Sequence, residues 1–252
     1  MKVYQESHEI LRDVNEVIVQ ASHDTGACYG ISKCAEIVFE CGKMVRGEGL
    51  EVLEEGIKTM DPDENEIYKF LGIEQVDGIK TKKVFERVKC VVKKRVKMLT
   101  NTELNDVNLV RAINTKVIPV AAYPMNVCKF TGEELKELDQ VIKRELRSKN
   151  MLGMQASDER LYLKREDGGR GIKSLRDIYK EMRLRVACYM ACSENKWISA
   201  AWRTENAKQE NSIGKEAMKI KEDVEVETQF EEGIIRIDGE LIDKGWKPAW
   251  KR

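Results

Sequence analysis

The sequence predicts an α+β fold in which a helix and short strands are followed by a longer, mainly helical region. Hydrophobic residues recur at helical spacing over most of the chain beyond residue 80, whereas β-forming residues alternate with polar ones in short stretches before it. Charged residues make up 35% of the chain and aromatic residues 6%, a composition that favours a helix-rich protein over a β-sandwich.

Charge divides the chain, although its formal net charge is zero. Residues 1–79 carry 7 basic and 17 acidic side chains, residues 80–200 carry 27 and 15, and residues 201–252 carry 10 and 12. We expect these ranges to be a helix-and-strand domain, a helical domain, and a polar linker with a hairpin-like tail. A basic region of this size is typical of a protein that binds a polyanion.

The acidic region is expected to begin with a helix. Ser7 is a suitable N-cap, and hydrophobic residues at helical spacing predict a helix over residues 7–25. Alternation over residues 35–40 predicts a strand that ends in a turn at residues 41–43. Residues 44–65 have weak periodicity, and Gly47, Gly49 and Asp61–Pro62 are expected to mark loops.

The stretch Glu66–Ile73 links the two regions. Tyr68, Phe70 and Ile73 are β-formers, and Gly72 permits a bend. These residues predict a short, half-buried strand that ends in a turn.

The basic region is expected to begin with a long helix. Glu86 is the only acid between residues 80 and 102, against nine cations. Neighbouring cations on one helix repel each other by a few tenths of a kcal/mol per close pair, and a bound polyanion offsets this repulsion. We therefore favour nucleic-acid binding over a merely solvated face. The apolar stripe of this helix has the spacing i, i+4, i+7, i+8, i+12: Val84, Val88, Val91, Val92 and Val96.

Further helices are predicted downstream. One covers Asn105–Ile118 and is expected to end at Pro119. Thr131 and Glu134 have the spacing of a capping box at the start of a second, and Ser174 is the N-cap of a third.

The remaining stretches predict strands, turns and linkers. Leu161–Leu163 is strand-like, and Asp167–Gly171 predicts a tight turn rather than a phosphate-binding loop, because it lacks the glycine and lysine spacing of such loops. Residues 208–232 are polar and predict a linker or a solvated helix. The tail Gly233–Ile242 predicts a hairpin.

Several classes of function are disfavoured by composition. The seven cysteines include no C-x-x-C pair, which predicts reduced thiols in an intracellular protein. Two histidines leave little for a nucleophilic triad, and no acidic cluster has metal-ligand spacing, so we expect neither a metal nor another cofactor bound to this chain. No signal peptide and no apolar run of about 18 residues is present, and no membrane association is expected.

Four stretches together resemble one enzyme family. They are Thr25–Cys34, Tyr68–Ile73, the basic helix from Lys80 with residues 112–123, and Arg165–Gly171 with Leu175 and Asp177. In this order they are similar to motif D and motif E of the palm, the thumb, and a segment just beyond the thumb in reverse transcriptases of non-LTR (LINE-like) retrotransposons. The resemblance covers residues 1 to about 190 and implies a partial polymerase palm followed by a mainly helical thumb.

The resemblance also implies roles for single residues. Lys33 matches the motif D lysine that donates a proton to the departing pyrophosphate. The primer grip that positions the primer 3′ end corresponds to Tyr68, Lys69, Phe70, Leu71 and Gly72. The thumb residues that contact the phosphates of an RNA–DNA template–primer correspond to Lys82, Lys83, Arg87, Lys94 and Lys97.

The chain departs from the family pattern in one respect. No stretch resembles motif A or the Y-x-D-D turn of motif C, whose aspartates bind Mg²⁺ in the full-length enzymes. Met1–Tyr4 resembles the strand that leaves that turn, so we expect a fragment that lacks the catalytic aspartates and is inactive without the N-terminal part of the polymerase. Such a fragment is expected to have an unpaired strand edge and an exposed apolar face.

Two other functions remain open from the sequence. The basic helices alone suit a non-enzymatic nucleic-acid-binding module. A helical protein-interaction scaffold without a polyanionic ligand ranks last.

Overall fold

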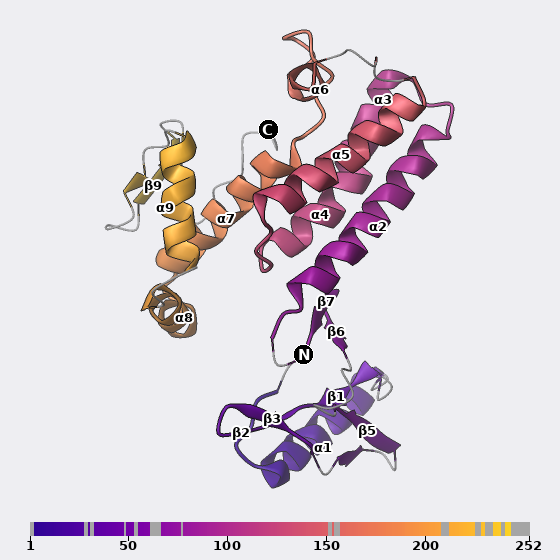
Figure 1. Ribbon diagram of the computed structural model, residues 1–252. Helices are drawn as coiled ribbons and strands as arrows, with labels where there is room; N and C mark the ends of the chain where they lie inside the picture. Colours follow the sequence, from indigo (N-terminus) through magenta and orange to yellow (C-terminus); the bar gives the residue numbers. More distant parts are fainter. Residues whose placement is uncertain are drawn as a thin grey trace. The chain divides into compact units, whose positions relative to one another are not determined.

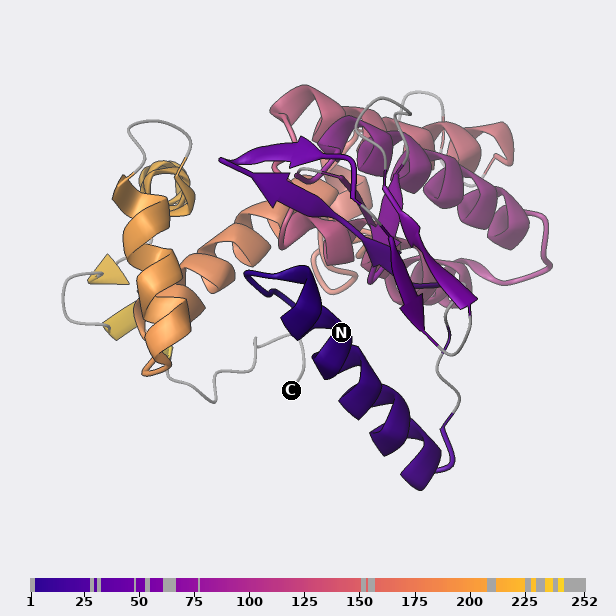
Figure 2. The same ribbon diagram turned by 90° about the horizontal axis from the view of Figure 1, so that it is seen from below.

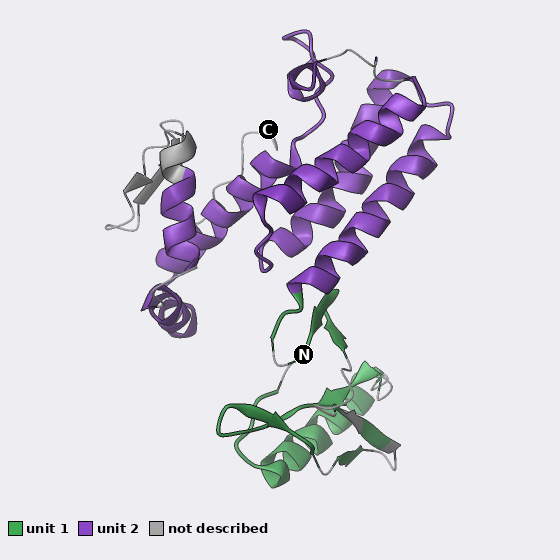
Figure 3. Cartoon of the chain, viewed as in Figure 1, with its two compact units in different colours: residues 1–80 green, residues 81–252 purple. Residues whose placement is uncertain are grey.

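The chain forms two compact units, residues 1–80 and residues 81–252 (Figure 3). Both come from a computed structural model, and together they contain helices and short strands, as expected for an α+β protein. The described residues are 3–27, 30, 33–47, 49–52, 55–60, 67–76, 78–150, 153, 157–207, 212–224, 228–229, 234–237 and 240–242.

The first unit contains one helix and a series of short strands (Figure 1). In chain order these are α1 (His8–Asp24), β1 (Ala35–Glu36), β2 (Val38–Glu40), β3 (Lys43–Val45), β4 (Leu50–Val52), β5 (Glu55–Thr59), β6 (Tyr68–Phe70) and β7 (Ile73–Gln75).

Helix α1 confirms the prediction for residues 7–25. The hydroxyl of Ser7 accepts a hydrogen bond from the backbone N–H of Ile10 at 3.3 Å, which satisfies one of the free donors at the helix start. Leu11 packs against a small core formed by Leu50 and Ile57, and Figures 1 and 2 show α1 along one side of the strands. Val17 is 69% exposed, so α1 also has an apolar side that the described residues leave uncovered.

The loop predicted at Gly47 and Gly49 is confirmed, since both lie between β3 and β4, whereas Asp61–Pro62 lies outside the described residues. The weak periodicity of residues 44–65 nevertheless hides strands. This range contains β3, β4 and β5; β4 and β5 form an antiparallel pair, and β1 pairs with β5 in parallel. β3 pairs with its neighbour β2, so the β1–β5 pair is the one that joins strands distant in sequence. Periodicity within a short polar stretch does not show the pairing of strands this short. The turn predicted before β3 is confirmed, since Cys41 and Gly42 both have positive φ, as a two-residue hairpin turn requires.

The stretch predicted as strand over residues 35–40 is divided between β1 and β2, which belong to different sheets. Its burial is the reverse of what hydrophobicity alone suggests: Phe39 is 50% exposed, whereas Glu36 is buried. Glu36 lies 3.3 Å from the Nε2 atom of His8 on α1, so a polar contact accompanies its burial. Residues 3–5 form no strand, so the match of Met1–Tyr4 to a polymerase strand is not realised in the described part.

The linking stretch is confirmed as a strand and a turn, and it continues into a second strand. β6 pairs with β7 in antiparallel fashion. The connecting residues Leu71 and Gly72 have φ values of 48° and 80°, the left-handed values of a tight two-residue turn. Glu66 lies outside the described residues.

The second unit is mainly helical (Figure 1). Its elements are α2 (Thr81–Thr100), α3 (Asp106–Ala112), the π-helix η3 (Ile113–Val117), α4 (Ile118–Met125), α5 (Gly132–Ser148), α6 (Glu159–Tyr162), α7 (Leu175–Ala191), α8 (Lys196–Ala207), α9 (Ile213–Val224), β8 (Thr228–Gln229), β9 (Ile234–Ile237) and β10 (Glu240–Ile242).

The apolar stripe of α2 lies in the core of this unit, as expected. Val84, Val88, Val92 and Val96 are fully buried. α2 packs against α4 and α5, and the ring of Phe85 meets Phe130 edge to face with centroids 5.8 Å apart.

Pro119 does not end a helix, contrary to prediction. The helix continues from α3 through η3 into α4, with Pro119 near the start of α4. A π-helix changes the hydrogen-bond register, so a residue without an N–H can follow it at little cost. Pro124 lies in the last turn of α4, which ends at Met125.

The predicted helix starts at Thr131 and Ser174 are confirmed. Thr131 and Glu134 form the reciprocal hydrogen bonds of a capping box, at 3.2 and 2.7 Å, and Ser174 caps α7. The strand predicted over Leu161–Leu163 is wrong, because residues 159–162 form the single helical turn α6. The carbonyls of Leu161 and Leu163 nevertheless accept backbone hydrogen bonds from Ile172 and Gly171.

The C-terminal part is more regular than expected. α8 was not predicted, and α9 occupies part of the range predicted as a linker or solvated helix. Arg183 on α7 is buried and pairs with Glu216 on α9 at 2.7 Å, and Tyr179 donates a hydrogen bond to the same carboxylate. The hairpin prediction is confirmed by the pairing of β9 with β10, whose turn residues lie outside the described part. None of the helices in the described ranges combines the length and apolar character needed to cross a bilayer.

Candidate nucleic-acid interface

The exposed side of α2 carries a row of cations, which we call the α2 stripe: Lys83, Arg87, Lys94 and Lys97. Their spacing of i, i+4, i+11 and i+14 places them on one face, opposite the buried valines. At about 1.5 Å of rise per residue the row is about 21 Å long. Cys90, which is exposed, lies at its centre, seven residues from either end.

Two further cations of α2 are engaged within the unit. Lys89 forms ion pairs with Glu137 of α5 at 2.9 Å and with Glu86 at 3.6 Å, and the hydrogen bond to Glu137 raises the pKa of Lys89. Arg95 donates a hydrogen bond of 2.6 Å to the carbonyl of Lys116. These two side chains therefore help to hold α2 against its neighbours.

The stripe lysines have no such partners. Within the described residues, Lys83, Lys94 and Lys97 are exposed and form no ion pair with an acid. Arg87 is half-buried. Lys82 is exposed as well, but it lies about 100° around the helix from Lys83, on the flank of the stripe. The structure thus brings four of the five predicted thumb residues onto one face.

The predicted palm residues meet through one hydrogen bond. The hydroxyl of Tyr68 in β6 donates to the carbonyl of Lys33 at 3.0 Å, across 35 positions of sequence. The side chain of Lys33 is exposed, and residues 28, 29, 31 and 32 of the matched stretch lie outside the described part. The proton-donor role of Lys33 stays a prediction.

The predicted primer-grip residues form the β6 strand and its turn. Tyr68 and Phe70 are half-buried, whereas Lys69 and Leu71 are exposed, and Leu71 and Gly72 form the turn. The arrangement leaves Lys69 and the Leu71 side chain accessible to a ligand. Contact with a primer stays a prediction.

Sequence reasoning missed the polar contacts that fix residues 165–173, which we call the glycine-rich turn. Arg165 and Arg170 in this turn both pair with Asp106 at the start of α3. The side chain of Asn114 in η3 donates to the carbonyl of Gly171 at 2.8 Å and accepts from the N–H of Lys173 at 3.0 Å. These partners are more than 55 positions apart, so no local pattern reveals them.

A pocket of about 630 Å³ lies beside this turn, and we call it the α4–α7 pocket. Its wall combines two tyrosines, Tyr123 and Tyr162, with apolar side chains and lysines at positions 164 and 173. It is formed by η3, α4, the glycine-rich turn and the first turns of α7, which include two of the stretches that resemble the reverse transcriptases.

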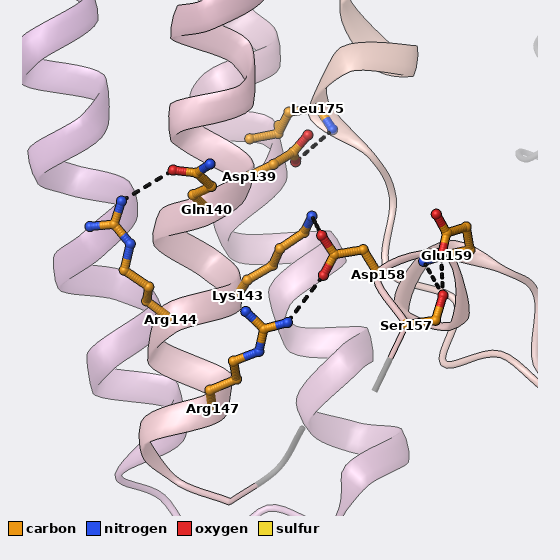
Figure 4. Close-up of polar contacts among 9 residues, drawn as sticks. All are labelled: Asp139, Gln140, Lys143, Arg144, Arg147, Ser157, Asp158, Glu159 and Leu175. Atoms are coloured by element: carbon orange, nitrogen blue, oxygen red, sulfur yellow. Dashed lines mark hydrogen bonds and ion pairs between the residues drawn. The ribbon is translucent and has the colours of Figure 1, made fainter. Parts of the chain in front are cut away.

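A charged cluster joins α5 to the segment that precedes α6. Figure 4 shows Lys143 and Arg147 pointing toward Asp158, at 2.6 and 3.3 Å. The ammonium of Lys143 also lies 5.3 Å from the centre of the Tyr162 ring. The interactions lower the pKa of Asp158, chiefly through the hydrogen bond from Lys143.

Asp139 is the buried acid beside this cluster. Its carboxylate accepts a hydrogen bond of 3.2 Å from the N–H of Leu175 at the start of α7. Burial raises the pKa of Asp139 to about 6, although this hydrogen bond opposes the change. A sequence signal was present, because Asp139 falls in the apolar stripe of α5 one position after Leu138.

Comparison with known proteins adds no family. A scan against protein-family models finds no match, and a search of curated proteins finds no relative. The palm and thumb assignments therefore depend on the four stretches of sequence described above.

Proposed function

We propose that the second unit binds the phosphate backbone of an RNA–DNA template–primer through the α2 stripe, as the thumb of a reverse transcriptase of the non-LTR retrotransposon type. The first unit would be the C-terminal part of the palm of this RNA-directed DNA polymerase. The observation that carries the proposal is the row of cations on α2, three of which are exposed and have no acidic partner among the described residues.

The geometry of the stripe suits a polyanion. A duplex carries one negative charge per about 1.7 Å of its axis, so a row about 21 Å long faces many phosphates at once. Lysine and arginine side chains that contact phosphates release condensed counterions, which makes binding salt-dependent and independent of sequence. Four contacts predict a slope of log affinity against log salt of about −3 to −4.

The first unit contributes the proposed primer contacts. The hydrogen bond between Tyr68 and Lys33 supports this part of the proposal, because it links the stretches that resemble motifs E and D. Primer extension would also need the metal-binding aspartates of motifs A and C, which no stretch of these 252 residues resembles. We therefore expect template–primer binding without primer extension by this chain alone.

A non-enzymatic nucleic-acid-binding module is the second candidate. It is favoured by the division of the chain, since the second unit has its own core and carries the entire stripe. The two candidates differ in their ligand: a thumb with a primer grip prefers a recessed 3′ end, whereas a simple module binds a blunt duplex equally well.

The test is a salt series with a labelled RNA–DNA template–primer. The variant K83A/K94A/K97A is compared with K136A/R144A/K149A, which removes three exposed charges from α5 and its end. We expect the first variant to reduce the salt slope by about 2 to 3 and the second to leave it unchanged. Equal slopes for both variants, or a flat response in the unmodified chain, would refute binding through the stripe.

A further inference from the structure

We infer that the α4–α7 pocket holds one unstacked base of a single-stranded nucleic-acid segment that continues from the duplex. This inference rests on the proposed function, because it assumes that the second unit binds nucleic acid. It adds a second contact of different chemistry, which recognises a base rather than phosphates.

The pocket has the volume and aromatic lining of a site for a planar ring. Its volume of about 630 Å³ is within the usual range for small-ligand sites. Tyr123, which is 53% exposed, and Tyr162 both line it. Stacking on aromatic side chains accepts any base, because every base has a π-face. Apolar side chains, among them Ile118 and Ile172, line the pocket together with polar ones.

Polar groups at the pocket match the rest of a nucleotide. Lys164 and Lys173 line it and carry the charge that flanking phosphates require, although Lys164 also pairs with Glu166 at 3.3 Å. Asp177 also lines the pocket, and carboxylates accept hydrogen bonds from the exocyclic amines of bases. A purely apolar ligand would use none of these groups.

The pocket is held open by contacts within the protein. Asn114 fixes the glycine-rich turn at both Gly171 and Lys173, and the two arginines that pair with Asp106 fix its other end. Binding to a preformed site avoids the cost of ordering it. The π-helix that carries Asn114 belongs to a class of element common at functional sites.

The pocket and α2 lie on either side of one helical element. Arg95 of α2 reaches the carbonyl of Lys116 in η3, and Asn114 of the same π-helix lines the pocket. The α2 stripe faces away from this element, opposite the buried valines, so a strand that leaves the stripe must also pass α2 itself. Two helices are together about 20 Å across, which about six stacked nucleotides span, so a single-stranded extension of that length or longer reaches the pocket.

The experiment compares two ligands that share one RNA–DNA duplex: one blunt, and one with a single-stranded template extension of eight uridines. The variants are Y123A, Y123F and the stripe variant K83A/K94A/K97A. We expect Y123A to lose about fivefold or more in affinity for the extended duplex and none for the blunt one, and Y123F to bind as the unmodified chain does. The stripe variant should weaken both ligands.

A second readout locates the base directly. 5-Iodouridine in the extension should crosslink on illumination to Tyr123 or Tyr162, as identified by mass spectrometry, and Y123A should reduce the yield.

If Y123A binds the extended duplex normally and no crosslink forms at either tyrosine, the pocket inference fails. The proposed function still stands in that case if binding through the α2 stripe is salt-dependent. If neither duplex binds, both fail. If Y123A instead weakens binding of the blunt and the extended duplex equally, Tyr123 does not act through a single-stranded base and the inference is overturned.

Discussion

Replacing Asp139 with asparagine should stabilise the second unit at neutral pH. The folded state raises the pKa of this carboxyl from 3.8 to about 6, mainly because the side chain is buried. At about 1.36 kcal/mol per pKa unit, the ionised form costs the folded state about 3 kcal/mol. Asparagine keeps an oxygen that accepts the hydrogen bond from Leu175 and carries no charge.

The sign of the pH dependence follows from proton binding. Because the folded protein holds this proton more tightly than the unfolded chain, the folded state binds more protons between about pH 4 and pH 6. The free energy of unfolding therefore falls as pH rises through that window, and the full penalty is present at pH 7. The free energy of unfolding of D139N should be higher than that of the unmodified chain by up to about 3 kcal/mol at pH 7 and should match it at pH 4.

The assay is urea denaturation followed by tryptophan fluorescence from pH 4 to pH 8. All four tryptophans lie beyond residue 196, so the signal reports the second unit alone. D167N, which changes an exposed carboxylate in the glycine-rich turn, is the control. Equal pH dependence in D139N and the unmodified chain would show that the buried carboxyl does not titrate in this window, and the reasoning from burial would be wrong.

Two further substitutions test contacts that position the candidate sites. Y68F removes the hydrogen bond to the Lys33 carbonyl and should raise the rate of amide hydrogen exchange over residues 33–36 by a few fold. This increase corresponds to a lost stabilisation of about 0.5–1 kcal/mol. Unchanged exchange would mean that the bond does not hold the two stretches together. G169A places a Cβ in overlap with the backbone carbonyl of Leu163 and should cost the second unit about 1–3 kcal/mol in urea denaturation. G132A, where a Cβ meets no atom, should be neutral or slightly stabilising; equal effects of the two alanines would contradict the close packing of the turn.

Helices and their caps were predictable because their signals are local. Thr131 and Glu134 are three positions apart, and the α2 valines repeat within one helix, so all partners of each interaction lie within one short stretch of sequence. The same holds for the α2 stripe, whose members share a face by helical geometry alone.

The features that sequence reasoning missed depend on distant partners or on very short elements. β3 pairs with β2 and β4 with β5, all of them short strands, and β5 also pairs with β1, which is distant in sequence. The continuation of the helix past Pro119 depends on a π-helix, and the α4–α7 pocket requires Asn114 to meet residues nearly 60 positions away. Neither has a signature in the local order of residues.

Alkylation of Cys90 tests the central claim most directly. Cys90 lies at the centre of the α2 stripe, and Cys41 in the first unit is also exposed and serves as an internal control. The rates at both thiols are measured with a maleimide and mass spectrometry, with and without saturating RNA–DNA template–primer. The account predicts that the ligand slows alkylation of Cys90 severalfold, that this protection disappears at high salt, and that Cys41 reacts at its original rate. If the template–primer is bound in the same sample and Cys90 still reacts as fast as in the free protein, binding through the α2 stripe is contradicted.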